Sequence, residues 1–236
     1  MPVMGVFRRI KEGWIDISNE HTGNDSYWYL SPLFYGFKKN LFPLIVLQAR
    51  GNVLDAGGGR GAYQSLTNVE SYTRMDIRHD YNPDVVGDIF HTPLKPESFD
   101  TILFSQVLEH LPYPLNALKE LRTLLKPDGT LILSVPHLSW LHNEPNDYYR
   151  FTHHGLKILL TDAGFRIDII ERSCGILSFF FHLFITFYMP FLYYIPFLKK
   201  PLLFITKYLS ITIFHLDKKI GIMNILPVNY IVIAKR

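Results

Sequence analysis

The chain has 236 residues, of which 48% are hydrophobic and 19% charged, a composition that suits one large globular domain and excludes a disordered or collagen-like chain. The chain has a net charge of +3. The apolar stretch 176–216 carries three lysines and no acid, so the rest of the chain has no net charge. A neutral body lacks the basic face that DNA or RNA binding needs, so we expect no nucleic-acid partner. The single Cys174 excludes an internal disulfide and a multi-cysteine zinc site.

Residues 1–50 predict a helical lead-in or lid. Apolar residues follow helical spacing from Phe34 to Val46, with Pro43 as an interruption. The aromatic run Tyr27, Trp28 and Tyr29 would either cover a pocket or pack as a surface cluster at a sheet edge. Because polar residues follow the first arginines, we expect no signal peptide and a cytoplasmic protein.

Residues 51–172 alternate short apolar runs with longer segments of helical period, the rhythm of a layered α/β fold. The runs are nearly continuous in apolar residues, which is typical of parallel strands covered on both faces. We therefore expect a sheet with helices on both sides. The expected strands are Val53–Leu54, Thr101–Phe104, Leu131–Val135, Arg166–Ile170 and Tyr230–Ala234.

Two helices are well marked within this region. In the first, Leu118, Leu121 and Leu125 recur at helical spacing, and the turn at 127–129 is expected to stop the helix. In the second, Thr152 is placed to cap the amino end and Gly164 to end the helix. Its buried stripe is expected to comprise Leu156, Leu159, Leu160 and Ala163.

A glycine-rich loop follows the first expected strand. Asp55 ends that strand, and Gly57, Gly59 and Gly61 come after it at every second position. Glycines let a backbone bend sharply and approach a ligand closely, while a following helix would present free N–H groups. The loop predicts a nucleotide site. With Ala62 it also fits the relaxed dinucleotide pattern, so an NAD(P)-dependent oxidoreductase is an alternative.

Further landmarks favour one family over that alternative. In their order the segments resemble the class I S-adenosylmethionine-dependent methyltransferases, of a bacterial small-molecule or glycan type. The resemblance implies a Rossmann-like, seven-stranded, mostly parallel sheet and S-adenosylmethionine as cofactor. The matching segments are Asp55–Gly61, Tyr72–Ile77, Val86–Ile89, Phe99–His110 and Leu125–Leu131.

The resemblance also assigns the expected cofactor contacts. Asp55 and the backbone around Gly57, with Gly59 and Gly61, would offset the positive amine and sulfonium. Asp76 would take the ribose hydroxyls, a charge-assisted contact worth about 1.5–3 kcal/mol. The remaining expected contacts are Ile77 against adenine, Asp88 and the Ile89 backbone at the adenine amino group, and Ser105 and Gln106 at the methionine portion.

Acceptor chemistry is expected in the loop after the fifth strand. This loop carries His137, His142 and Tyr148, and its run Asp147–Thr152 resembles the same methyltransferase subgroup. Our hypothesis is that His142 or His137 removes a hydroxyl proton, because neutral imidazole titrates near working pH. We expect no metal, since His137, His142, Asp147 and His153 form no recognised ligand spacing.

The stretch 176–216 is expected to be an insert before the last strand. It is rich in Phe and Tyr, lacks acids and carries Lys199, Lys200 and Lys207. Pro190 and Pro196 disfavour a spanning helix, so we favour a re-entrant or interfacial helical pair whose lysines meet anionic head groups. The alternative is a homodimer interface. The methyltransferase domain would then comprise residues 51–175 and 217–236.

These features predict a cytoplasmic methyltransferase at the inner face of the membrane. We expect it to methylate oxygen in a lipid-linked saccharide or another amphiphilic hydroxyl compound, with a quinone-pathway phenol as a related acceptor. The alternative of another class is a non-catalytic scaffold that binds the nucleoside and a membrane or partner.

Overall fold

The computed structural model of the protein describes residues 2–21 and 24–236, apart from the side chains of residues 2–4 and 7. The chain forms two compact units. The sheet unit comprises residues 40–172 and 229–236. The helical unit comprises residues 1–39 and 173–228. The N-terminal segment and the hydrophobic insert 176–216 thus belong to the same unit.

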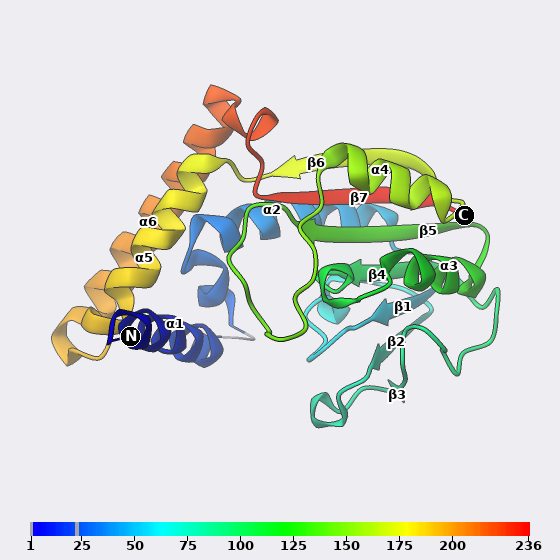
Figure 1. Cartoon of the computed structure of the whole chain (residues 1–236), viewed down its shortest axis with the longest axis horizontal. Coiled ribbons are helices and arrows are strands. Elements are labelled where there is room, and N and C mark those ends of the chain that lie inside the picture. The colour runs from blue at the N-terminus through cyan, green and yellow to red at the C-terminus, as the bar shows by residue number, and fades with distance from the viewer. Residues whose placement is uncertain (1, 22–23) are drawn as a thin grey trace. The chain divides into compact units, whose positions relative to one another are not determined.

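The sheet has seven strands in the order β3-β2-β1-β4-β5-β7-β6 (Figure 1). β1 pairs in parallel with β2 and β4, β4 pairs in parallel with β5, and β7 runs antiparallel to β5. The expected Rossmann-like, mostly parallel sheet is confirmed. Its order reverses between β1 and β4, and a ligand crevice is expected at that point. The strands are β1 (Asn52–Ala56), β2 (Ser71–Asp76), β3 (Val85–Val86), β4 (Phe99–Ser105), β5 (Leu125–Pro136), β6 (Arg166–Ser173) and β7 (Asn229–Lys235).

The expectation that the glycine loop opens a helix is wrong. Between β1 and β2 the chain forms turns and one short 3-10 helix, η2 (Gln64–Leu66). The loop glycines adopt left-handed backbone conformations that interrupt a helix, and the residues left after Gly61 are too few for a helix and a return to β2. An anion-binding helix N-terminus is therefore missing at this loop.

Two helices of the sheet unit lie on the face of the sheet nearer the viewer in Figure 1, α3 (Pro114–Leu124) and α4 (His153–Asp162). The cap of α4 is confirmed: the Thr152 hydroxyl accepts a 3.1 Å hydrogen bond from the Gly155 N–H, and Gly164 follows the helix with φ +88°. α3 ends at Leu124, because Leu125 already belongs to β5. The expected turn at 127–129 thus lies inside the irregular start of that strand.

One hydrophobic core joins the sheet to these helices. Leu54 of β1, Ile102 of β4 and Leu131 of β5 are fully buried in it, as are Leu118 of α3 and Leu156 of α4. The near-continuous burial of the central strands fixes their register and holds the loops at their carboxyl ends in place.

The helical unit is built around α1 (Pro2–His21), α5 (Ile176–Leu192) and α6 (Pro196–Ile220), with α1 and α6 both packed on α5. The Trp14 ring lies 5.5 Å from the ring of His182, and the Ser31 hydroxyl is 2.9 Å from His182 Nδ1. Further members of the unit are the 3-10 helices η1 (Asp25–Tyr29) and η5 (Ile222–Asn224) and the first part of α2 (Pro32–Gln48).

The aromatic run of the N-terminal segment packs inside this unit. The Tyr27 ring stacks on Phe34 with 4.6 Å between centroids, and the Tyr29 ring lies 5.6 Å from Tyr35. Lys207 of α6 sits over the Tyr29 ring at 4.7 Å. The run thus links η1 to α2 and α6 by ring contacts within the helical unit.

α5 and α6 bury small polar side chains and expose aromatic ones. Ser178 and Thr186 of α5 and Thr206 and Ser210 of α6 are buried. A helix surrounded by water has the reverse distribution, with its apolar stripe inward. The exposed aromatic side chains, each more than half exposed, include Phe180, Phe184, Phe191, Phe197, Phe204 and Tyr208.

Within the described part of the chain, no helix combines the length and the hydrophobicity needed to cross a bilayer. The apolar stretch is broken between Leu192, where α5 ends, and Pro196, where α6 begins.

Candidate functional site

The loop after β1 is bent by glycines and tied to the end of β2. Gly57, Gly59 and Gly61 have φ of +70°, +49° and +77°. A Cβ on Gly57 would lie 2.6 Å from Val107 Cγ2, so this position accepts no side chain. The N–H groups of Gly57 and Gly58 both donate to the Met75 carbonyl, at 2.8 and 3.2 Å.

Asp55 lies buried at the end of β1. Its Oδ2 accepts a 2.7 Å hydrogen bond from the Tyr72 hydroxyl on β2. Burial raises the pKa of Asp55 to about 6, although the Tyr72 hydrogen bond acts in the opposite direction. A cationic ligand beside this carboxylate would relieve the cost of its buried charge.

Asp76 ends the neighbouring strand β2 and is held by two backbone groups. Its Oδ2 accepts from the Gly59 N–H and its Oδ1 from the Arg78 N–H, both at 2.9 Å. Each carboxylate oxygen has a second lone pair, so the fixed carboxylate can still accept from a pair of hydroxyls.

The surroundings of Asp76 fit a nucleoside. The apolar Ile77 side chain is 67% exposed, and a Cβ on Gly59 would meet no atom closer than the Tyr81 ring at 4.0 Å. An exposed apolar side chain next to a fixed acid and an open backbone bend is the arrangement that a base and its ribose need. The residues present therefore fit the expected cofactor.

Asp88 and Ile89 lie beyond β3 and differ from each other in exposure. The Asp88 carboxylate is exposed, and its Oδ1 accepts a 3.0 Å hydrogen bond from the Phe90 N–H. The Ile89 side chain belongs to the hydrophobic core, which leaves only its backbone for a ligand.

Ser105 and Gln106 form a polar network at the end of β4. The Ser105 hydroxyl is 2.8 Å from both the Tyr63 and the Ser134 hydroxyls. Gln106 has φ +56°, and its N–H donates to the Ser134 carbonyl at 2.9 Å. Tyr63 and Ser134 were not expected from sequence. In the sheet, Ser134 of β5 lies directly opposite Ser105 of β4. Aligning the two expected strands in this register would have identified Ser134 as a neighbour of Ser105.

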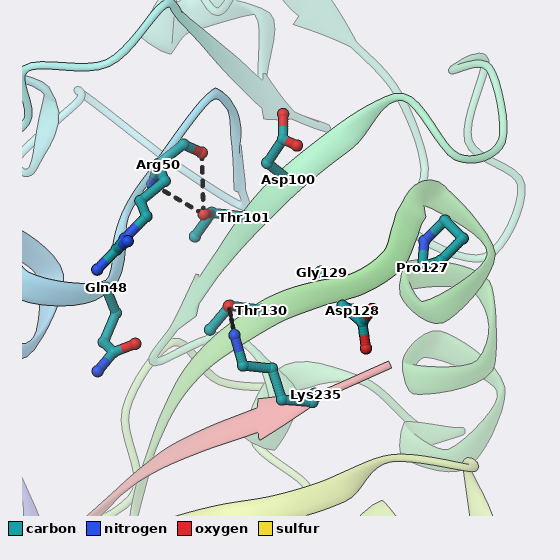
Figure 2. Close-up of a pocket in the computed structure, with 9 residues that line it drawn as sticks. All are labelled: Gln48, Arg50, Asp100, Thr101, Pro127, Asp128, Gly129, Thr130 and Lys235. Carbon is teal, nitrogen blue, oxygen red and sulfur yellow. Dashed lines mark hydrogen bonds between the residues drawn. The ribbon is translucent and has the colours of Figure 1, made fainter.

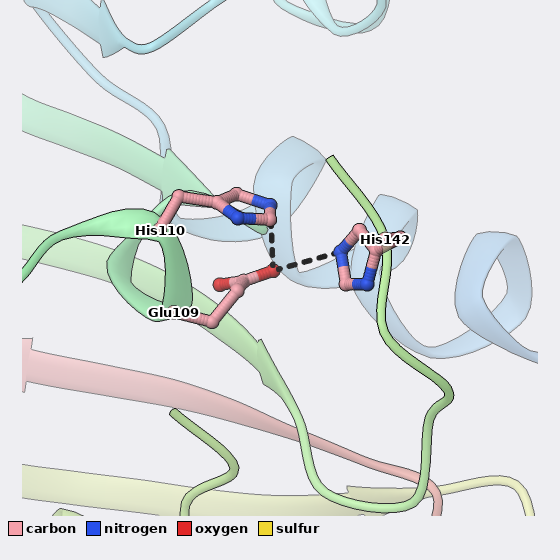
Figure 3. A group of neighbouring side chains, drawn as sticks. All are labelled: Glu109, His110 and His142. Atoms are coloured by element: carbon pink, nitrogen blue, oxygen red, sulfur yellow. Dashed lines mark ion pairs between the residues drawn. The ribbon is translucent and has the colours of Figure 1, made fainter. Parts of the chain in front are cut away.

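Glu109 follows this network in the 3-10 helix η4 (Leu108–His110). Its side chain is fully buried, and neither carboxylate oxygen has a hydrogen-bond partner among the residues that the structure describes. Burial raises the pKa of Glu109 to about 8. Figure 3 shows the carboxylate facing the rings of His110 and His142, whose Nε2 atoms lie 3.7 and 3.9 Å from Oε1.

His142 comes from the loop after β5 and is held by an ion pair. The Asp147 Oδ2 accepts from the His142 N–H at 2.9 Å, and Arg150 binds both Asp147 oxygens at 2.6 and 2.7 Å. Burial, the largest single influence, would raise the pKa of Asp147, but the hydrogen bonds and charges of Arg150 and His142 together outweigh it and lower the pKa to about 2. Burial lowers the pKa of His142, which favours the neutral imidazole.

The other two expected catalytic residues lie at different distances from this cluster. Tyr148 is beside it, because its N–H donates to the Glu109 carbonyl at 2.9 Å, while its hydroxyl donates to Asn146 Oδ1. His137 is engaged elsewhere: its Nδ1 is 2.9 Å from the Phe151 carbonyl, and its ring lies 5.5 Å from the Tyr230 ring. Of the two expected bases, His142 is the one beside a buried carboxylate.

A separate cavity of about 360 Å³ opens at the opposite end of the sheet (Figure 2). It is lined by the start of β4, at Asp100 and Thr101, and by Thr130 and Lys235. Because ligands of open α/β sheets bind at the carboxyl ends of the strands, we assign the cofactor to the glycine-loop end instead.

Comparisons with known proteins identify the family of this chain. A family model described as a methyltransferase domain matches residues 33–168, more than half of the chain. An uncharacterized protein of Methanocaldococcus jannaschii, MJ0638, is 36% identical over 108 residues, which cover 42% of this chain and 48% of that protein. The ubiquinone biosynthesis O-methyltransferase of Haemophilus ducreyi is 46% identical over 45 residues, 19% of each chain. The chain thus matches about half or less of these relatives.

Solved structures share the fold. A SAM-dependent methyltransferase from Archaeoglobus fulgidus superposes with a TM-score of 0.51 at 21% identity, over 86% of this chain and 99% of that one. The [4+2]-cyclase SpnF gives 0.58 at 17% identity, over 83% and 80%. A cyclase on the same fold means that the architecture alone does not fix the reaction. The family match and the glycine-loop site together show that this chain belongs to the methyltransferase domain family, whose cofactor is S-adenosylmethionine.

Proposed function

We propose that this protein transfers a methyl group from S-adenosylmethionine to a hydroxyl oxygen of an amphiphilic acceptor. The observation that carries the proposal is the relation of two sites along the sheet. The glycine loop and Asp76 follow β1 and β2, and the cluster of Glu109 and His142 adjoins the end of β4. Donor and acceptor groups are thereby expected on either side of the switch point.

The donor side depends on fixed acids and a rigid backbone. Bound S-adenosylmethionine supplies an activated methyl group on a cationic sulfonium. Asp76 would orient the ribose through its free lone pairs, and Asp55 would balance positive charge. Orientation of the reacting groups can contribute on the order of 7–11 kcal/mol to such a displacement.

The acceptor side needs a group that removes a proton from a hydroxyl. The neutral His142 is suited to this role, because its backbone is held by Asp147 and its Nε2 faces Glu109. The acceptor oxygen would form a bond to the methyl carbon while the carbon–sulfur bond breaks. The His142 imidazole would take up the hydroxyl proton, and the cofactor would be left as its demethylated product, S-adenosylhomocysteine.

The helical unit supports an amphiphilic acceptor. α5 and α6 expose aromatic side chains and carry no exposed carboxylate, because their one acid, Asp217, is buried. Small polar residues between two helices and aromatic ones outside are typical of helices in an apolar surrounding. Lys200, Lys218 and Lys219 are exposed and would meet anionic head groups, whereas Lys199 is already paired with Glu20 at 2.7 Å. We therefore propose that the enzyme works at the cytoplasmic face of a membrane, with the exposed aromatic side chains of α5 and α6 toward the lipid.

Two acceptor classes follow from this membrane-surface proposal. One is a lipid-linked saccharide. The other is a quinone-pathway phenol, which the local similarity to ubiquinone biosynthesis O-methyltransferases favours, although that similarity covers 19% of this chain in the Haemophilus ducreyi enzyme. Both acceptors present a hydroxyl on an apolar anchor.

Methyl transfer is tested with purified protein, labelled S-adenosylmethionine and membrane lipid extracts. We expect a labelled lipid product, and a loss of turnover in His142→Ala of about 100-fold or more. His137→Ala is the matched control, because its imidazole lies outside the Glu109 cluster. Cofactor binding without any transfer would instead support the non-catalytic scaffold.

Membrane attachment is tested by flotation with vesicles of phosphatidylglycerol and of phosphatidylcholine. We expect binding to the anionic vesicles and its loss in Phe184→Glu, on the exposed face of α5. Ile158→Glu on α4 is the control, because its side chain is equally exposed but lies in the sheet unit. A protein that never floats but dimerises through α5 and α6 would contradict membrane attachment.

A further inference from the structure

Glu109 is a buried acid whose charged form has no hydrogen-bond donor to compensate it within the described part of the chain. Its side chain is 0% exposed, and both oxygens lack a hydrogen-bond partner among the described residues. The imidazole nitrogens of His110 and His142 that face it are 3.7 and 3.9 Å from Oε1, too far for hydrogen bonds. A buried carboxylate of this kind costs several kcal/mol unless a cation or hydrogen-bond donors compensate it.

The three side chains leave a gap of the size that a metal ion needs. One donor atom from each of Glu109, His110 and His142 lies within 4.8 Å of the other two (Figure 3). Nitrogen and oxygen ligands bind Zn²⁺ at about 2.0–2.2 Å in a tetrahedral arrangement, so two of them lie about 3.4 Å apart. The separations of 3.7 and 3.9 Å between Glu109 Oε1 and the two histidines exceed this spacing by a few tenths of an ångström. A pair at the 4.8 Å limit would have to close by about 1.4 Å, which requires movement of the partly exposed histidine rings.

The outer contacts of both histidines suit a ligand role. His110 Nδ1 is 2.6 Å from the Asn146 carbonyl, and His142 Nδ1 is 3.3 Å from the Trp140 carbonyl. A backbone carbonyl bound to Nδ1–H leaves the lone pair of Nε2 free, which is the usual arrangement of metal-binding histidines. Both free nitrogens face the Glu109 carboxylate.

Two polar neighbours compete with this arrangement at longer range. Asn143 Nδ2 is 3.5 Å from His110 Nε2, and Asn143 is exposed, so it can turn aside. Arg150 Nη2 is 3.4 Å from His142 Nδ1 but makes its shorter bonds to Asp147. The ion pair of Arg150 with Asp147 leaves little net charge to repel a cation.

We propose that Glu109, His110 and His142 form a binding site for a divalent transition-metal ion of the Zn²⁺ type. A donor set of two imidazoles and one carboxylate favours such ions over Mg²⁺ or Ca²⁺, which prefer oxygen ligands. The side chains of His110 and His142 are 17% and 29% exposed, so the ion has an entry path and an open position. At that position the ion would lower the pKa of a bound acceptor hydroxyl, and the proton would pass to solvent, because a metal-bound His142 could no longer accept it. The binding of metal is independent of the proposed methyl transfer, whereas this role in deprotonation rests on it.

The site is tested by metal titration of the full chain. Zn²⁺ affinity is measured against a chromophoric chelator, and Co²⁺ is added separately to record visible absorption from ligand nitrogens. We expect one ion to bind per chain. Glu109→Gln and His142→Ala should each lower the Zn²⁺ affinity by more than about 100-fold. This exceeds the loss expected when only a residue that hydrogen-bonds a metal ligand is removed. His154→Ala is the control, because His154 is exposed on α4 and lies outside the cluster.

Cofactor binding by each variant, measured in parallel, verifies that the variants are folded. The proposal is overturned if the wild type binds no ion, or if the wild type and the Glu109→Gln and His142→Ala variants bind it equally well. Methyl transfer by metal-free protein would leave the proposed function intact with His142 as a free base, so the two failures are distinguishable.

Discussion

The backbone N–H of Gly59 donates a 2.9 Å hydrogen bond to Oδ2 of Asp76, so the glycine loop and the acid that ends β2 form one rigid element. The Gly57 and Gly58 N–H groups add bonds to the Met75 carbonyl one residue earlier on the same strand. The loop is therefore fixed by β2 rather than by a helix of its own. Its geometry should be present before any ligand binds.

Asp76→Ala is expected to weaken S-adenosylmethionine binding by about 10- to 150-fold, which corresponds to the loss of charge-assisted contacts worth about 1.5–3 kcal/mol. The same change removes the acceptor of the Gly59 N–H, so the loop also loses an anchor. Calorimetric titration gives the affinity. Asp162→Ala, an exposed acid at the end of α4, is the control and should bind as the wild type does. Equal affinities of Asp76→Ala and the wild type would rule out the assignment.

Cofactor affinity is expected to fall as the pH drops below about 6, because a proton on Asp55 then competes with the cationic ligand. The pKa of Asp55 is raised from 3.8 to about 6 in the folded protein, so the folded state holds this proton more tightly than the unfolded state. The contribution of Asp55 to stability is therefore full below pH 3.8 and is lost as the pH rises through 6. A bound cation reverses the preference, and affinity should decrease by up to about tenfold per pH unit below 6.

This dependence is measured by titrations between pH 5 and 7.5, a range chosen to span the pKa of about 6. Asp55→Asn removes the titrating carboxylate while nearly keeping its shape. The variant should bind more weakly at pH 7.5 and show a flat profile. A profile in the variant as steep as that of the wild type would assign the pH effect to another group.

Gly57→Ala is expected to destabilise the protein and to impair cofactor binding. The residue has φ +70°, which costs a side-chain-bearing residue about 1–2 kcal/mol, and its new Cβ would lie 2.6 Å from Val107. Urea unfolding gives the stability change. Gly221→Ala is the matched control: its φ is +75°, but the nearest atom to a Cβ is 3.7 Å away, so it carries the backbone cost without the clash. If both variants lose the same stability, the contact with Val107 contributes nothing.

Much of the sheet could be predicted because its signals are local. The apolar runs at Val53–Leu54 and Thr101–Phe104 became β1 and β4, and the Thr152 cap and Gly164 stop bounded α4 as expected. Asp55 stands at the end of a strand that such a run defines, whereas the position of Asp76 at the end of β2 was indicated only by the family resemblance. Such patterns depend on neighbours in sequence, so a single chain reveals them.

What could not be predicted depends on contacts between distant segments. Nothing near His142 in sequence indicates that its loop returns to the buried Glu109, so the cluster had no recognisable ligand spacing. Likewise, the hydrophobic composition of residues 176–216 indicated an insert. It did not indicate that α5 would pack on α1 or bury its Ser and Thr residues. No helix forms after Gly61 because too few residues separate it from β2. The glycine pattern alone gives no information about this spacing.

Asp217→Ala is expected to destabilise the helical unit selectively. This buried acid of α6 accepts hydrogen bonds from the N–H groups of Gly175, Leu177 and Ser178, at 3.0, 3.2 and 2.9 Å. Helix α5 begins here without a side-chain cap of its own, so Asp217 supplies the acceptor that its first turn needs. Leaving three buried donors unpaired should lower the free energy of unfolding by on the order of 3 kcal/mol or more.

Urea unfolding followed by circular dichroism measures that loss. Asp217→Asn keeps one oxygen acceptor and should lose less stability than the alanine variant. Asp16→Ala, an exposed acid of α1 in the same unit, should be nearly neutral. If Asp217→Ala were as stable as Asp16→Ala, water would have to satisfy the amino end of α5 as well as the carboxylate does. The pairing of α5 with α6 would then rest on packing alone, and their polar inner faces would need another explanation.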